Sequence, residues 1–361
     1  MTALSAFLAF AGFAMLVILH ELGHFWAAKS VGMRVEKFSL FFPPTLFSRK
    51  RGETEYAVGL IPAGGYVKIS GMNPSEDLPD EVRTRAYYAQ PVWKRIVVIA
   101  AGPAMNLILA FVLLFAFIFL IGASTQSSEV GVVEKGYPAA ALLKPGDKLV
   151  SVDGKRGDPA VLSKQVASHK CPGRSTKGCD AAEPATVTVE RKGRERSFEV
   201  TPIYDPAAKR TRIGFSYAQG PRETLPFGES LDWTVNRFWF VTRATLELPA
   251  RLIDPEQRKD ISGVVGSYEV TRQTILNDVA QVVGILAIIS LSLAIVNLFP
   301  FLPLDGGHIF WAIVEKVRRK PVSFRVMERA GVVGFMLVIL IFLVGLSNDI
   351  GRLSGEGFQV P

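Results

Sequence analysis

The residues best suited to chemistry are His20, Glu21 and His24, in the run His20-Glu21-Leu22-Gly23-His24. Positions i and i+4 share one face of an α-helix, so two imidazoles at this spacing can bind one zinc ion. The glutamate between them can reach the metal-bound water and act as a general base. The run continues an uncharged apolar stretch, where ionisable side chains are costly unless they have a function. The alternative is a Glu–His ion pair that packs two helices together.

A hydrolytic zinc site has three protein ligands and one open position, and the sequence offers Asp305 as the third ligand. Asp305 lies in the segment 297–308, where Pro300 and Pro303 interrupt helical hydrogen bonding. An acidic residue at the end of a broken apolar helix is a suitable ligand. We do not expect His308 to bind zinc, because a fourth protein ligand would close the water position.

Four uncharged apolar stretches are long enough to place these residues in or beside a membrane. They cover residues 3–19, 96–122, 282–304 and 331–347. Hydrophobic residues make up 49% of the 361 residues and charged residues 20%, which indicates a chain that is partly embedded in lipid and partly soluble. No Lys or Arg precedes the first stretch and no small-x-small cleavage site follows it, so we expect a retained span and not a signal peptide.

The distribution of basic residues predicts the topology. Lys and Arg gather between the first two stretches and between the last two, and cytoplasmic loops carry such an excess. We therefore expect both basic loops in the cytoplasm, and both termini and the segment 123–280 outside. The two zinc motifs then lie at the cytoplasmic ends of their spans, at one depth. The formal net charge of +8 belongs to these loops, and we expect no nucleic-acid partner.

The outside segment 129–218 reads as a small β-rich domain. Strands are expected at residues 130–133, 148–152 and 186–190, with turns at 144–147 and at Asp153-Gly154. Residues 137–154 resemble the core of bacterial PDZ domains. Such domains bind peptide C-termini by adding a strand to a sheet edge. The alternative is a spacer domain that binds nothing strongly.

Cys171 and Cys179 lie in a Gly/Ser/Lys-rich insert of this domain. Outside the cytoplasm, a disulfide that closes this short loop is the expected use. A metal site of His169, Cys171, Cys179 and Asp180 is the alternative, although the two-residue Cys spacing of zinc knuckles is missing. Further along, residues 225–252 carry Leu231, Val235, Phe238 and Thr242 at helical spacing, which predicts an amphipathic helix at the membrane surface.

The first basic loop contains a predicted β-hairpin, with strands 55–61 and 66–69 around a turn at 62–65. Two strands alone are marginally stable, so the hairpin needs support from the membrane spans or from a third strand. An exposed strand edge beside zinc could bind an unwound peptide through main-chain hydrogen bonds. The alternative is a re-entrant loop that only seals the site. The residues expected to present the substrate are Val58, Gly59, Ile61, Gly64, Gly65 and Tyr66.

Together these motifs resemble the site-2 proteases, intramembrane zinc metalloproteases, in the bacterial form with one PDZ domain. His-Glu-Leu-Gly-His matches the first motif of that family, and Asn-x-x-Pro-x-x-x-Leu-Asp-Gly at 297–306 matches the second. Residues 61–68 resemble its membrane-associated hairpin, and residues 101–106 the opening of its second core span. The resemblance covers nearly the whole chain.

The resemblance implies that His20, His24 and Asp305 bind Zn²⁺ and that Glu21 is the general base. It also implies that Asn297 helps to hold the substrate backbone or the oxyanion. One departure concerns residues 262–266, which read Ser-Gly-Val-Val-Gly where many relatives have Ser-Gly-Pro-Val-Gly. We expect the missing proline to alter a gate and to leave the hydrolytic chemistry unchanged.

We therefore expect a polytopic α-helical membrane protein with four transmembrane helices, a membrane-associated β-hairpin and an extracytoplasmic PDZ domain. The expected segments are 1–124 with the first two spans and the hairpin, 125–218 as the PDZ domain, 219–280 with the amphipathic helix, and 281–361 with the last two spans.

By resemblance, the chain would cleave single-span proteins in the bacterial inner membrane, such as shortened anti-sigma factors or remnant signal peptides, in regulated intramembrane proteolysis. One rival is a PDZ-bearing membrane scaffold, or pseudoprotease, with a degenerate metal site. A second rival is an ion or metal transporter that uses the broken helix, although the inverted repeats expected of one are missing.

Overall fold

A computed structural model describes residues 2–354, apart from residues 74–75, 135, 174–175, 177, 207, 209 and 260. The predicted outside tail from residue 355 onward lies beyond the described residues. The chain forms two compact units. The first combines Met1–Leu120 with Leu225–Pro361, and the second is Ile121–Thr224.

Three helices of the first unit are long and apolar enough to cross a membrane: α1 (Thr2–Ser30), α3 (Val92–Ala116, continued by a π-helical turn to Ile121) and α11 (Phe324–Ser354). The third predicted span forms α9 (Gln281–Asn297), an apolar helix of 17 residues. At 1.5 Å per residue such a helix is about 25 Å long, at the short end for a membrane span.

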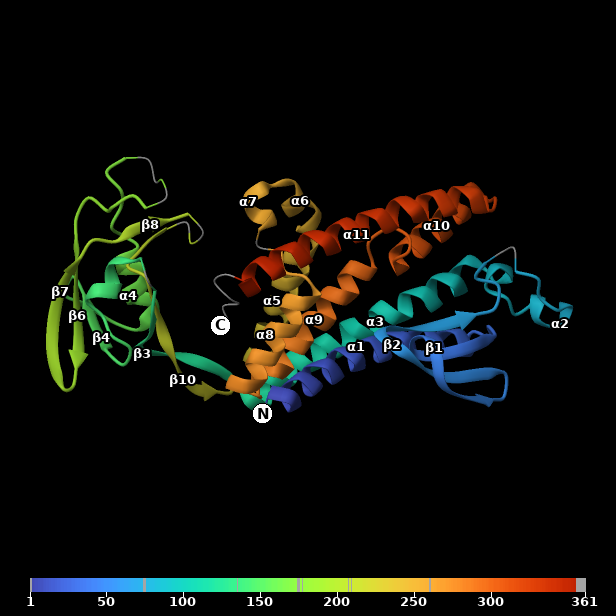
Figure 1. Ribbon diagram of the computed structural model, residues 1–361, viewed down its shortest axis with the longest axis horizontal. Helices are drawn as coiled ribbons and strands as arrows, with labels where there is room; N and C mark the ends of the chain where they lie inside the picture. Colours follow the sequence, from blue (N-terminus) through green and yellow to red (C-terminus); the bar gives the residue numbers. More distant parts are fainter. Residues whose placement is uncertain are drawn as a thin grey trace. The chain divides into compact units, whose positions relative to one another are not determined.

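Helix α3 packs along both α1 and α9 in the first unit (Figure 1). The contact with α1 is close because Gly23 lies against the main-chain carbonyl of Ala101, where a Cβ atom would collide. After α9 ends, a non-helical segment leads to α10 (Asp305–Arg318), which also packs against α3. Helix α3 therefore contacts each of the helices that carry the two predicted zinc motifs.

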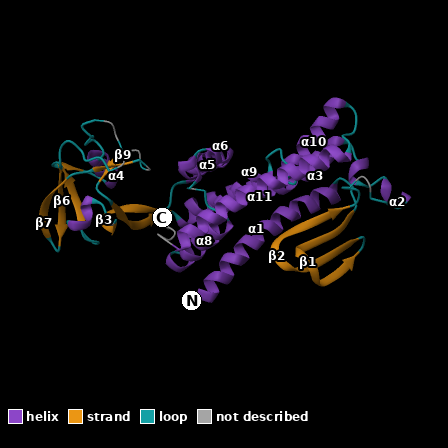
Figure 2. Ribbon diagram, turned by 45° about the horizontal axis from the view of Figure 1, so that its top comes forward, coloured by secondary structure: helices purple, strands orange, loops and turns teal. Residues whose placement is uncertain are grey.

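The strands β1 (Val35–Arg51) and β2 (Thr54–Ile69) form a sheet beside α1 (Figure 2). Phe38 lies opposite both Tyr56 and Val67, so the first half of β1 runs between two arms of β2. The second half of β1 pairs with the first arm again, as Phe47 does with Val58. The expected direct pairing of 55–61 with 66–69 is therefore wrong, because β1 occupies the space between them. The second arm, 65–69, is an edge of this sheet.

The segment predicted as one amphipathic helix forms α5 (Phe227–Leu246) and α6 (Leu248–Ile253). Helix α5 packs on α3 and α9, and the Phe238 ring meets Phe111 with ring centroids 6.1 Å apart. Ser230 and Thr234 of this helix are fully buried, while Trp239 is 65% exposed.

The segment 262–266 that departs from the usual motif leads into α8 (Val264–Asn277), which follows the short α7 (Pro255–Arg258). The carboxylate of Asp349 in α11 accepts hydrogen bonds from the main-chain N–H groups of Gly263 (3.0 Å) and Gly266 (2.7 Å) and from the Ser262 hydroxyl (3.0 Å). An acidic side chain at a helix N-terminus satisfies otherwise unpaired N–H groups. Asp349 thus ties α8 to α11.

The second unit contains a sheet in the order β10-β3-β4-β6-β7, and the short β5 (Lys155–Arg156) pairs with β4. The predicted strands are confirmed within β3 (Ala123–Val133), β4 (Lys148–Val152) and β6 (Ala185–Arg191). The others are β7 (Arg194–Val200), β10 (Phe215–Glu223) and the separate pair β8 (Ile203–Asp205) and β9 (Arg210–Arg212). Helix α4 (Pro159–Val166) contributes Leu162 to the core.

The Asp153-Gly154 turn has positive φ at both residues, 52° and 76°, as a tight hairpin turn requires. The unit extends beyond the expected 125–218 because β10 continues until Glu223 pairs with Ala123. Its two ends are therefore adjacent. A disulfide joins Cys171 to Cys179.

Candidate metal centre

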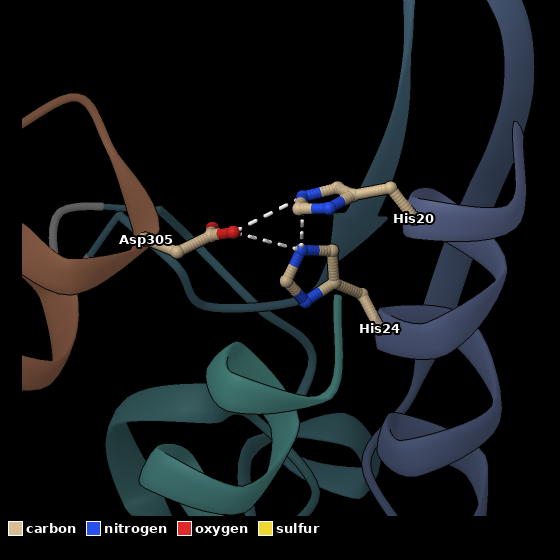
Figure 3. Close-up of side chains that lie close together, drawn as sticks. All are labelled: His20, His24 and Asp305. Atoms are coloured by element: carbon tan, nitrogen blue, oxygen red, sulfur yellow. Dashed lines mark hydrogen bonds and ion pairs between the residues drawn. The ribbon is translucent and has the colours of Figure 1, made fainter. Parts of the chain in front are cut away.

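The structure brings His20, His24 and Asp305 together (Figure 3). The two Nε2 atoms lie 3.3 Å apart, and Asp305 Oδ2 lies 3.1 Å from Nε2 of His20 and 3.3 Å from Nε2 of His24. The imidazoles come from successive turns of α1. Asp305 begins α10, 285 residues after His20.

This triangle fits a zinc ion. Donor atoms about 2.0–2.1 Å from one ion at the tetrahedral angle lie roughly 3.3 Å from each other. Both imidazoles are buried, and one carboxylate with two neutral imidazoles is a donor set that zinc hydrolases use. Three ligands leave a fourth position for water or substrate.

One face of α3 supports the two histidines. The main-chain carbonyl of Val98 accepts a hydrogen bond of 2.9 Å from His24 Nδ1, which directs the Nε2 lone pair toward the centre. Gly102, one turn later, lies directly against the His24 ring, where a Cβ atom would collide. Asn106, another turn on, has its carboxamide nitrogen 3.3 Å from His20 Nδ1. The contacts of Val98 and Asn106 with the histidines were not predicted from the sequence, although Asn106 follows Gly102 by four residues and so lies on the same face of α3.

An ion pair between Arg95 of α3 and Glu315 of α10 joins these two helices. The Arg95 guanidinium donates to both carboxylate oxygens of Glu315, at 3.0 and 2.6 Å, and lies over the Tyr87 ring. Such a bidentate pair fixes orientation as well as distance. It therefore helps to set where α10 begins and where Asp305 lies.

Glu21 lies beside the second arm of β2 and within electrostatic range of His20, His24 and Asp305. A Cβ atom on Gly65 would lie 3.2 Å from Glu21 Cγ, and the main chain of Val67 lies close to the Glu21 carboxylate. Tyr66 lies on the same arm, which Gly64 directly precedes, and the Tyr66 ring stacks on Phe42. The edge of the sheet thus passes beside the predicted general base.

The other predicted hairpin residues lie earlier in β2. Val58 and Gly59 belong to its first arm, which β1 separates from the second, and Ile61 lies opposite Phe42. Asn297 is the last residue of α9, and its side chain has no hydrogen-bond partner among the described residues. The structure does not bring it into contact with the three ligands.

An apolar cavity of about 1100 Å³ adjoins the site within the first unit. It is lined by residues of α1, α5, α6, α8, α9 and α11, and it reaches Gly64 and Gly65 on the edge arm. The cavity therefore ends beside Glu21.

Comparison with known proteins gives a consistent result. A model of Peptidase family M50 matches residues 8–341. The zinc metalloprotease Rip1 of Mycobacterium bovis is 31% identical over 373 residues, covering 91% of each chain. A candidate zinc metalloprotease of Nostoc sp. is 31% identical over 361 residues, covering 95% of this chain and 93% of its own length. One of Brucella suis is 30% identical over 360 residues, covering 93% and 92%.

Proposed function

The chain belongs to peptidase family M50, the site-2 proteases, and we propose that it hydrolyses peptide bonds within or beside the transmembrane segments of single-span proteins. It is a zinc metalloprotease with several helices of membrane-spanning length. The observation that carries the proposal is the convergence of His20, His24 and Asp305 between such helices, with Glu21 beside them. His20, His24 and Asp305 are the proposed ligands of zinc.

Bound zinc would polarise the scissile carbonyl and acidify the attacking water. Glu21 accepts the proton of that water and delivers it to the leaving amide nitrogen. Its side chain lies close to Gly65 and Val67 of the edge arm, along which a peptide would lie. Asn297, by family resemblance, holds the substrate backbone or the oxyanion.

A transmembrane helix satisfies its own main chain, so the substrate must unwind before it can be cut. The edge arm 65–69 offers main-chain groups to an unwound strand, and the adjoining apolar cavity accommodates the remaining apolar segment. Single-span proteins such as shortened anti-sigma factors and remnant signal peptides suit such a site.

The proposed location is the bacterial inner membrane, with four spans that include the short α9. The bias of Lys and Arg places both termini and the 121–224 unit, read as a PDZ domain that takes peptide C-termini, outside. Reporter fusions after Lys50 and Arg319 should read cytoplasmic, and one after Gly157 should read outside. An outside signal at Lys50 would contradict this topology.

Co-expression with candidate single-span proteins tests the activity. Glu21→Gln should keep zinc, because Glu21 is not a ligand, and should lose cleavage. His20→Ala or Asp305→Ala should lose both, whereas Glu229→Gln, at an exposed position of α5, should behave as wild type. Undiminished cleavage by Glu21→Gln would refute the mechanism. A wild-type protein that holds no zinc and cuts no substrate would favour the scaffold.

A further inference from the structure

Asn106 is a buried polar residue that the reaction outlined above does not use. Its side chain is fully buried in α3, with the carboxamide nitrogen 3.3 Å from His20 Nδ1. Its main-chain carbonyl accepts a hydrogen bond of 3.0 Å from the hydroxyl of Ser290, which is itself fully buried in α9. Asn106 therefore lies between the His20 imidazole and α9.

The geometry of His20 requires a partner at this point. Its Nε2 atom is the one that faces His24 and Asp305. A neutral imidazole can offer the Nε2 lone pair to a metal only when Nδ1 carries the proton, and a buried N–H needs an acceptor. His24 has the Val98 carbonyl for this purpose. Among the described residues, the group within hydrogen-bonding distance of His20 Nδ1 is the Asn106 carboxamide.

The carboxamide can present either end. Its nitrogen is the end toward Nδ1, while its Oδ1 is buried and has no partner among the residues that the structure describes. The two ends have nearly the same shape, so a half-turn about the Cβ–Cγ bond exchanges them without moving the backbone. After the half-turn Oδ1 accepts from Nδ1–H, and the cost of leaving the amide N–H groups without a partner is small beside the free energy of binding zinc.

We propose that Asn106 is a positioning residue for zinc, which orients the His20 ring and fixes its tautomer by accepting a hydrogen bond from Nδ1. Val98, Gly102 and Asn106 then form one face of α3 at intervals of four residues, in contact with both histidines. The proposal gives a chemical role to the segment 101–106, which resembles the opening of the second core span of the family. The proposal rests on the proposed zinc site and on no particular substrate.

Zinc affinity of the purified full-length protein, measured by competition with a chelator, tests this role without any substrate. Asn106→Leu has a similar volume and no acceptor, and it should bind zinc about 10- to 100-fold more weakly. Asn106→Asp can only accept, and it should bind zinc as tightly as wild type or more tightly. Substituted Co²⁺ should show a wild-type absorption spectrum in Asn106→Asp and an altered one in Asn106→Leu.

Ser290→Ala is the matched control, because it removes the hydrogen bond to the Asn106 main chain and leaves the carboxamide in place. It should keep wild-type zinc affinity. If Asn106→Leu fails to fold, the smaller Asn106→Ala takes its place with the same expectation. Wild-type affinity in Asn106→Leu or Asn106→Ala would overturn the proposal, and so would an Asn106→Asp variant as weak as either. If the wild-type protein cuts none of the candidate substrates while the zinc affinities of the variants rank as expected, the result counts against the proposed substrates and not against Asn106.

Discussion

Individual glycines decide how closely the metal-binding helices approach. Gly102 allows α3 to lie against the His24 ring, and an added Cβ atom would occupy the space of the imidazole. We expect Gly102→Ala to displace His24 and to lower the zinc content of the purified protein at least tenfold. The cause is a changed position of the imidazole, and the variant should still fold. Gly351→Ala is the control, since no atom lies within 4 Å of its added Cβ, and it should keep full zinc content. Equal zinc in both variants would contradict this packing.

Asp147 gives a pH-dependent prediction outside the membrane. Its side chain is 1% exposed, and Arg191 donates two hydrogen bonds of 2.6 Å to its carboxylate, which holds the pKa of Asp147 below its usual range. A carboxyl group with a lowered folded pKa adds stability above its unfolded pKa of about 3.9 and loses it as the pH falls through the folded pKa. We therefore expect the 121–224 unit to loosen below about pH 4.

Hydrogen exchange at the amides of β4 and β6, corrected for its intrinsic pH dependence, measures this loosening. Arg191→Met leaves a buried carboxylate without its cation and should cost about 2–4 kcal/mol at neutral pH. It should also flatten the decline in protection below about pH 4. An unchanged decline in the variant would show that other groups cause it.

At this scale the sequence predicted that His20, His24 and Asp305 lie close together, and the structure brings them together. The pairing of the two histidines follows from a local pattern, a spacing of four on a helix. The sequence did not predict the hydrogen bonds from Val98 and Asn106, which join atoms 74 and 86 positions apart in the chain. Contacts of that range have no local periodicity, so only the packed helices reveal them.

At the scale of elements, the two arms of β2 make different predictions. Val67 lies on the edge arm and its main chain meets Glu21, whereas Val58 lies on the inner arm and pairs with β1 on both sides. Proline removes an N–H donor and is tolerated only at sheet edges. Val67→Pro should keep zinc and expression and cut cleavage strongly. Val58→Pro should disrupt the sheet and lower expression. Full cleavage by Val67→Pro would show that substrate is not held by strand addition.

The elements were predictable where the pattern was simple. The apolar helices and the short strands of the second unit follow from length, alternation and turn residues. The insertion of β1 between the arms of β2 was missed, because Pro43 and Pro44 interrupt its sequence and hide a strand. The short α9 also differs from its predicted stretch, since the chain leaves the helix after Asn297, before Pro300.

At the scale of the molecule, the second unit can be removed cleanly. Its ends are adjacent because Ala123 pairs with Glu223, and in the first unit Phe119 and Phe227 lie with ring centroids 6.1 Å apart. A short Gly/Ser linker in place of 121–224 should therefore rejoin the helices and keep zinc, since no ligand comes from this unit. The variant should still cleave an already shortened substrate, and a filtering role predicts cleavage of an intact one as well. Loss of all cleavage in a stable, zinc-loaded deletion would contradict this.

The 285 residues between His20 and Asp305 also have a consequence for biosynthesis. A ribosome adds about 5–20 residues per second, so the third proposed ligand emerges roughly a quarter of a minute to a minute after the first. During that interval the nascent chain holds two imidazoles and a glutamate but not the acid that completes the triad. A polypeptide cut short by premature termination anywhere before α10 would be inert. Because Asp305 is translated late, hydrolytic activity can arise only after nearly the whole protein has been made.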